Sequence, residues 1–183
     1  TGTFVFHFVP GKVATENAGS ADWDITAVAT DAASGTDDES LTGLDMNWYG
    51  EISGVTANVN FGSVSLGAQQ ISTTELSAKY ISNGDYSEQA RTVAQWANGG
   101  YNANLETLTT PGDGEFTLWV NDEADTAGEF QLTASYIDID NNEVITTEDG
   151  VTNANIHLWL TLGASGIVSG TYTGNIYFAI SNR

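Results

Sequence analysis

Apolar and polar residues alternate along most of this chain with a period of two. Side chains in an extended strand point alternately to opposite faces, so this period predicts β-strands. Four segments show one apolar face, and these faces comprise Phe116, Leu118 and Val120; Phe130, Leu132 and Ala134; Ile156, Leu158, Leu160 and Leu162; and Ile176, Phe178 and Ile180. Strands with one dry face belong to antiparallel sheets packed in pairs. The pattern therefore predicts an all-β protein built as an antiparallel two-sheet β-sandwich.

The clearest alternation lies in residues 44–61 and predicts a β-hairpin. A two-residue turn at Ser53–Gly54 places Ile52 opposite Val55 and Trp48 opposite Val59. Every inward residue of one strand then meets an inward residue of the other, which is the arrangement that stabilises a hairpin.

Three other segments lack this alternation. Residues 87–96 are the one helix-like candidate, a short and ambiguous stretch considered as a surface turn of helix. Residues 31–40 and 109–115 are rich in Gly, Ser, Asp and Thr and are expected to form loops. No internal repeat is evident, so residues 1–183 are expected to form a single domain.

The first residues form a candidate strand that is apolar on both faces. Its two alternating sets are Phe4, Phe6 and Phe8 on one side and Val5, His7 and Val9 on the other. Burying the three phenylalanines is worth about 6–9 kcal/mol, so the strand is expected to find a partner. It either pairs with an edge of its own sheet or is donated to a neighbouring subunit by β-strand addition. In the second case residues 1–11 are a connecting strand and residues 12–21 a tether.

Charge and composition exclude several classes of function. Twenty-four acidic residues against four basic ones give a net charge of -20, which disfavours nucleic acid and anionic lipid as partners. The absence of cysteine excludes disulfides and thiolate chemistry. No apolar stretch approaches the ~20 residues that span a bilayer. A first residue of Thr fits removal of a signal peptide, so we expect an extracellular location at the cell surface.

Candidate catalytic chemistry is sparse. The two histidines, His7 and His157, lie inside apolar strands and have no nucleophile motif beside them. We therefore expect no enzymatic activity and no catalytic cofactor.

A calcium site is the one metal hypothesis that the sequence offers. A turn at Asn141–Asn142 places Asp140 opposite Glu143, with Asp138 on the same face. Three acids so close repel one another unless a cation lies between them, and hard oxygen ligands suit Ca²⁺. The alternative is an exposed acidic hairpin or a longer loop.

Two of the five tryptophans are candidates for contact with glycans or with another subunit. Trp119 and Trp159 lie opposite the apolar sets of their strands, whereas Trp48 lies on the dry face of its hairpin. Exposed rings would form a stacking platform for sugars or a protein interface. A second buried layer is the third interpretation.

Two stretches carry a resemblance to a known class of domain. Residues 58–68 contain Phe61, Gly62, Val64 and Gly67 in the spacing FG-x-V-x-x-G, and residues 169–181 contain GTYTG-x-I. The chain from residue 55 to 183 thereby resembles the immunoglobulin-like β-sandwich domains of archaeal and bacterial cell-surface proteins. The resemblance implies an immunoglobulin-like or jelly-roll-like sandwich, with an early strand at the first motif and a closing strand after the second. It also implies a layer, sheath or pilus protein.

These observations favour a self-assembling structural subunit. The sequence predicts a homopolymer at the cell surface, an S-layer, sheath, pilus or other filament, joined by residues 3–9. The alternative is a carbohydrate-binding or adhesive module that uses exposed tryptophans.

Overall fold

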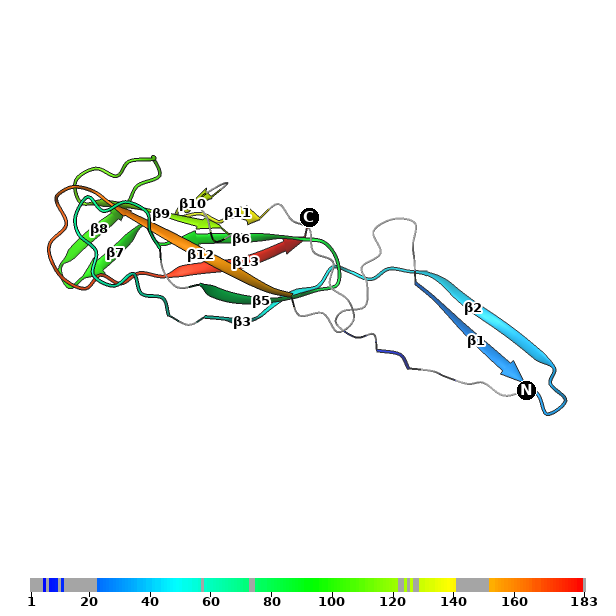
Figure 1. Ribbon diagram of the computed structural model, residues 1–183. Helices are drawn as coiled ribbons and strands as arrows, with labels where there is room; N and C mark the ends of the chain where they lie inside the picture. Colours follow the sequence, from blue (N-terminus) through cyan, green and yellow to red (C-terminus); the bar gives the residue numbers. More distant parts are fainter. Residues whose placement is uncertain are drawn as a thin grey trace.

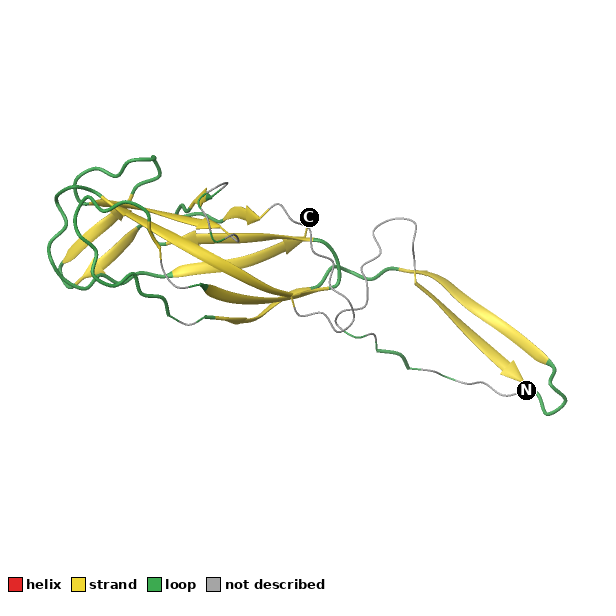
Figure 2. Ribbon diagram, in the orientation of Figure 1, coloured by secondary structure: helices red, strands yellow, loops and turns green. Residues whose placement is uncertain are grey.

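The computed structural model describes residues 5, 7–9, 11, 23–56, 58–72, 75–121, 124, 126, 129–140 and 152–182. Within these ranges every regular element is a β-strand (Figure 2). The described part of the chain accordingly holds no helix of the length and apolarity that crossing a membrane requires. The all-β fold class predicted from the alternating pattern is confirmed.

The strands form two packed sheets and one separate hairpin (Figure 1). The larger sheet has the order β3-β5-β12-β9-β8-β7, with β4 paired to β12 and β10 paired to β9. The smaller sheet has the order β11-β6-β13, and β1 pairs with β2. The strands are β1 (Trp23–Thr30), β2 (Thr36–Leu44), β3 (Gly50–Val55), β4 (Ile71–Ser72), β5 (Leu76–Ser82), β6 (Tyr86–Thr92), β7 (Gln95–Asn98), β8 (Tyr101–Leu105), β9 (Glu115–Asn121), β10 (Phe130–Gln131), β11 (Ile137–Asp140), β12 (Thr152–Leu162) and β13 (Ile176–Asn182).

Strand β12 organises the larger sheet. Its first half pairs with β5 and its second half pairs with β9 along the opposite edge. The register places Leu158 opposite Val120 and Leu160 opposite Leu118, and all four side chains are buried. Adjacent apolar residues on one face of neighbouring strands are what a sandwich core requires. The apolar faces predicted for these two strands are thus the centre of the core.

The smaller sheet closes the other side of this core. Tyr86 and Ala90 of β6 and Ile139 of β11 are buried in the same cluster as the leucines of β12. Strand β13 supplies Phe178 and Ile180, which pack against that cluster and stay half-buried. The core is therefore dry at its centre and less well covered along β13.

Strands β1 and β2 form a hairpin that extends away from the sandwich (Figure 1). Nearly all of its side chains are exposed. The loop expected at residues 31–40 is correct only for its first half, because residues 36–40 lie in β2. Their cross-strand pairing with β1 overrides the polar composition that favoured a loop.

The predicted hairpin turn at Ser53–Gly54 is wrong. Both residues lie inside the single strand β3, which pairs with β5 and carries a bulge between Ile52 and Gly54. The alternation between residues 44 and 61 indicated extended chain correctly. It could not show that the partner strand lies more than twenty residues further along the sequence.

The short helix considered for residues 87–96 is absent. Residues 86–92 form β6 and residues 95–98 form β7. Strand β6 alternates between buried and half-buried side chains, with Tyr86, Glu88 and Ala90 pointing into the core. Tertiary packing decides such a short ambiguous stretch.

The two stretches that carry the resemblance meet at Trp96. Its ring lies 4.5 Å from Phe116 and 6.1 Å from Phe61, measured between centroids, and it covers Gly174 so closely that a Cβ there would collide with the ring. The early strand expected at residues 58–68 is wrong, because residues 58–70 form no strand. Strand β13 begins at Ile176, inside the second stretch.

The sheets are not wholly antiparallel as predicted. Strand β8 runs parallel to the start of β9, with Leu105 opposite Phe116, while the other strand pairs of the described structure are antiparallel. Residues 106–114 connect the two strands, and β9 starts beside the end of β8 and runs in the same direction. A tight hairpin turn joins only antiparallel strands, so a longer connection is needed here.

Candidate functional site

The described part of the amino-terminal segment presents apolar side chains to solvent. Val5 is 74% exposed, Phe8 is 62% exposed and Val9 is 88% exposed, and His7 is exposed beside them. These residues form no strand in this single chain. The predicted donor positions Phe4 and Phe6 lie outside the described residues. The described positions are therefore unburied, as expected of a segment whose partner is elsewhere.

The β1–β2 hairpin is a second exposed element that the sequence interpretation missed. Its turn is fixed by Asp31, whose Oδ1 accepts hydrogen bonds from the N–H groups of Ala33 and Gly35 at 2.8 Å each. Ile25 lies opposite Leu41, and both side chains are exposed. The alternation of Ile25, Ala27 and Ala29 ahead of an Asp-rich turn was the signal that could have found it.

An isolated two-stranded hairpin is marginally stable in water. Here neither face of the hairpin packs on the sandwich, and both outer edges leave backbone groups unpaired in the described structure. Acidic side chains lie near its tip, where Asp37, Asp38 and Glu39 follow one another. The hairpin is thus suited to contact with another molecule.

The predicted calcium ligands fall partly outside the described residues. Asp138 is exposed and its Oδ1 accepts a hydrogen bond from Gln89 Nε2 at 2.9 Å. The backbone of Asp140 lies opposite Glu88 in the β11–β6 pair, and Glu143 lies outside the described residues. Among the residues that the structure describes, no group of three acidic or histidine side chains is placed to hold a metal ion.

Trp119 and Trp159 lie directly opposite each other on β9 and β12. Trp159 is only 6% exposed, while Trp119 is half-buried. The neighbouring Thr117, Asn121 and Thr161 on this outer face are also buried. The second buried layer is therefore the correct interpretation of Trp159, and it offers no ring face to a sugar.

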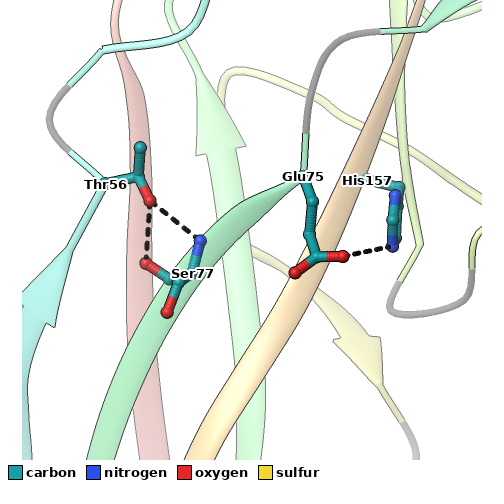
Figure 3. Close-up of polar contacts among 4 residues, drawn as sticks. All are labelled: Thr56, Glu75, Ser77 and His157. Carbon is teal, nitrogen blue, oxygen red and sulfur yellow. Dashed lines mark hydrogen bonds and ion pairs between the residues drawn. The ribbon is translucent and has the colours of Figure 1, made fainter.

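His157 lies beside an acidic residue, and the contacts described for it do not form a catalytic triad. Its Nε2 lies 3.9 Å from Glu75 Oε2 (Figure 3). Its ring centroid lies 6.2 Å from that of Trp159. Thr56 and Ser77, drawn beside them, bond to each other: Ser77 N–H donates to Thr56 Oγ1 at 2.9 Å. This bond continues the β3–β5 ladder by one residue, so these hydroxyl-bearing residues have a structural role.

The pKa of the Glu129 carboxyl is shifted from its usual value. Burial beside β10 raises the pKa of Glu129, and a hydrogen bond with the Gln70 side chain partly offsets this shift. Glu129 and Gln70 come from two loops of the larger sheet, and the described structure has no metal-binding group of three acidic or histidine side chains here.

The comparisons with known proteins place no relative beside this chain. No family model, no curated protein and no solved structure matches it.

Proposed function

We propose that this protein is a structural subunit of an extracellular cell-surface assembly that polymerises by β-strand addition. Residues 3–9 of one copy act as the donor strand for the next. The assembly is a filament, pilus, sheath or S-layer. The observation that carries the proposal is the exposure of Val5, Phe8 and Val9 in the single chain.

The energetic argument is the cost of leaving this segment in water. Complete burial of a Val or Phe side chain contributes about 1.5–3 kcal/mol, so three of them favour association by an amount comparable to a folded domain's net stability. A segment donated head to tail leaves each new subunit with its own donor exposed, and the contact propagates.

The β1–β2 hairpin supports the same proposal independently. Ile25, Val28 and Leu41 are exposed on it, and a two-stranded ribbon needs further packing to be stable. Neighbouring subunits in a polymer provide that packing. A ribbon held away from the core adds no packing to the sandwich of a monomer.

The test compares two full-length variants of equal charge. Val5→Asp combined with Phe8→Asp places two carboxylates in the donor segment, where burial in a groove is costly. Leu66→Asp combined with Leu108→Asp makes the same change at two other exposed apolar residues of the sandwich. Sedimentation and negative-stain microscopy measure assembly, and the thermal midpoint checks that each variant is folded.

We expect the wild type and the Leu66/Leu108 variant to form polymers and the Val5/Phe8 variant to remain monomeric. A folded wild-type protein that stays monomeric across salt and concentration contradicts the proposal. Equal polymerisation of both variants also contradicts it, because the amino-terminal segment then has no part in the contact.

A further inference from the structure

The outer edge of β13 is an unoccupied strand position in the smaller sheet. The sheet order β11-β6-β13 places β13 at one end, and β6 is the one described strand that pairs with it. The backbone groups on the other side of Ile176–Ser181 therefore have no strand partner in the described structure. Such an edge accepts a further strand by main-chain hydrogen bonding.

The apolar face of β13 is incompletely covered as well. Ile176, Phe178 and Ile180 pack toward the core but remain half-buried, whereas the corresponding residues of β9 are fully buried. The larger sheet ends beside it in β3, where Ile52 is also half-buried. Ile180 Cδ1 lies 3.0 Å from the position a Cβ would take on Gly50, so β13 and β3 are the facing margins of the two sheets. The Trp48 ring also lies at the Gly50 end of this margin, and Ile176, Phe178 and Ile180 stay half-buried along it.

We infer that this margin is the acceptor groove, and that its occupant is residues 3–9 of a second copy of this chain, added as a fourth strand beside β13. This inference rests on the proposed function and names the surface that the donor strand meets. Phe4, Phe6 and Phe8 then lie beside Ile176, Phe178 and Ile180 over the core. Val5, His7 and Val9 lie on the outer face.

The length and alternation of the two segments match. Strand β13 has seven residues, as does the segment 3–9, and each has three large apolar residues at every second position. A strand added in this register covers the half-buried face of β13 along its whole length, because strand side chains alternate with a period of two.

Three other edges of the two packed sheets are less suited to a seven-residue apolar strand. Strand β11 has four residues and carries Asp138 and Asp140. Strand β3 has a bulge between Ile52 and Gly54, which interrupts regular pairing. Strand β7 has four residues and is already bridged at Ala97 by Thr173.

The occupant comes from a second copy because the segment is exposed in its own chain. Val5, Phe8 and Val9 retain most of their accessible surface although the margin of β13 belongs to the same molecule. Pairing with this margin within one chain buries Phe8, and pairing between chains leaves Phe8 exposed until assembly.

The experiment is thiol cross-linking between full-length single-cysteine variants. The chain has no cysteine of its own, so only the introduced thiols react. The donor variant is His7→Cys, and the acceptor variant is Ala179→Cys, at the centre of β13 on the outer face. Matched acceptors on other edges are Ser53→Cys in β3 and Gln95→Cys in β7, both exposed. Each donor–acceptor mixture assembles and is then treated with a short bifunctional thiol reagent.

We expect the His7→Cys and Ala179→Cys mixture to give cross-linked dimers in about tenfold or greater excess over the β3 and β7 mixtures, because pairing raises the effective thiol concentration. Backbone amides of residues 176–181 should also gain protection from hydrogen exchange on assembly.

The outcomes separate this inference from the proposed function. Polymers that cross-link preferentially through position 53 or 95, with no protection of residues 176–181, overturn the acceptor assignment and leave polymerisation through the donor segment intact. Absence of polymers overturns both. A His7→Cys/Ala179→Cys double variant that cross-links within monomers at high dilution shows pairing inside one chain and also overturns both.

Discussion

Asn83 and Tyr49 are joined by two hydrogen bonds. The backbone N–H of Tyr49 donates to Asn83 Oδ1 at 2.6 Å, and the backbone N–H of Asn83 donates to the carbonyl of Tyr49 at 3.1 Å. Asn83 Nδ2 also donates to the carbonyl of Asn47 at 2.9 Å. The buried Asn83 side chain thus holds the segment that connects β2 to β3 against the turn between β5 and β6.

Replacing Asn83 with Ala should destabilise the sandwich. Two hydrogen bonds disappear and two backbone groups lose their partners, which costs about 2–3 kcal/mol and lowers the thermal midpoint by about 4–12 °C. Differential scanning calorimetry measures this change. Asn102→Ala, on the exposed face of β8, is the control and should lie within about 0.5 kcal/mol of wild type. Equal midpoints for the two variants would show that the Asn83 contacts carry no net stability.

Gly163 should not tolerate a side chain. A Cβ on Gly163 would collide with the carbonyl oxygen of Gly112, because the loops at this end of the sandwich pack backbone to backbone. Gly163→Ala should therefore cost about 3 kcal/mol, the upper range of overpacking. Gly100 has open space around its Cβ position and serves as the matched control. Chemical denaturation of both variants tests the expectation, which fails if Gly163→Ala is as stable as Gly100→Ala.

Trp159 should act in stability and not in sugar binding. Trp159→Ala removes a buried ring and should cost about 3–5 kcal/mol. Trp119→Ala, directly across the strand pair, removes a half-buried ring and should cost less. Titration of the wild type with a panel of soluble glycans, followed by tryptophan fluorescence, should show no saturable change. A saturable change that Trp119→Ala abolishes would favour the carbohydrate-binding alternative.

Assembly should increase with salt. Two copies that each carry a net charge of -20 repel one another, and the screening length shortens from about 10 Å at 0.1 M to about 3 Å at 1 M ionic strength. Light scattering in sodium chloride should show faster polymerisation at 1 M than at 0.1 M. The Val5→Asp/Phe8→Asp variant should remain monomeric at both concentrations. Slower assembly of the wild type at high salt would mean that attraction between opposite charges drives the contact.

Glu129 should make stability depend on pH. Burial raises the pKa of Glu129 in the folded state above its usual value of 4.5. The folded state therefore holds this proton more tightly than the unfolded state, and stability falls as the pH rises from about 4.5 through the raised pKa. Glu129→Gln should remove this dependence and be at least as stable as wild type at pH 7. Unfolding free energies measured for both proteins between pH 4 and 7 test this, and parallel profiles would contradict it.

The sequence by itself determined the all-β class and the central core strands. The apolar sets of β9, β12 and β13 were readable because side chains in a strand alternate between faces, whichever strand lies next to them. The apolar character of residues 3–9 was also readable, whereas the exposure of Val5, Phe8 and Val9 in the single chain was not.

Only the tertiary structure decided which strands are neighbours. Residues 50–55 were expected to pair across a turn at Ser53–Gly54, yet they pair with β5, because the alternation specifies a face and not a partner. Trp159 lies on the face opposite the leucines of β12, and only the packing around it buries its ring. The projecting hairpin and the half-buried margin of β13 are likewise properties of assembled sheets. Both depend on contacts between residues far apart in the chain, which a local pattern does not encode.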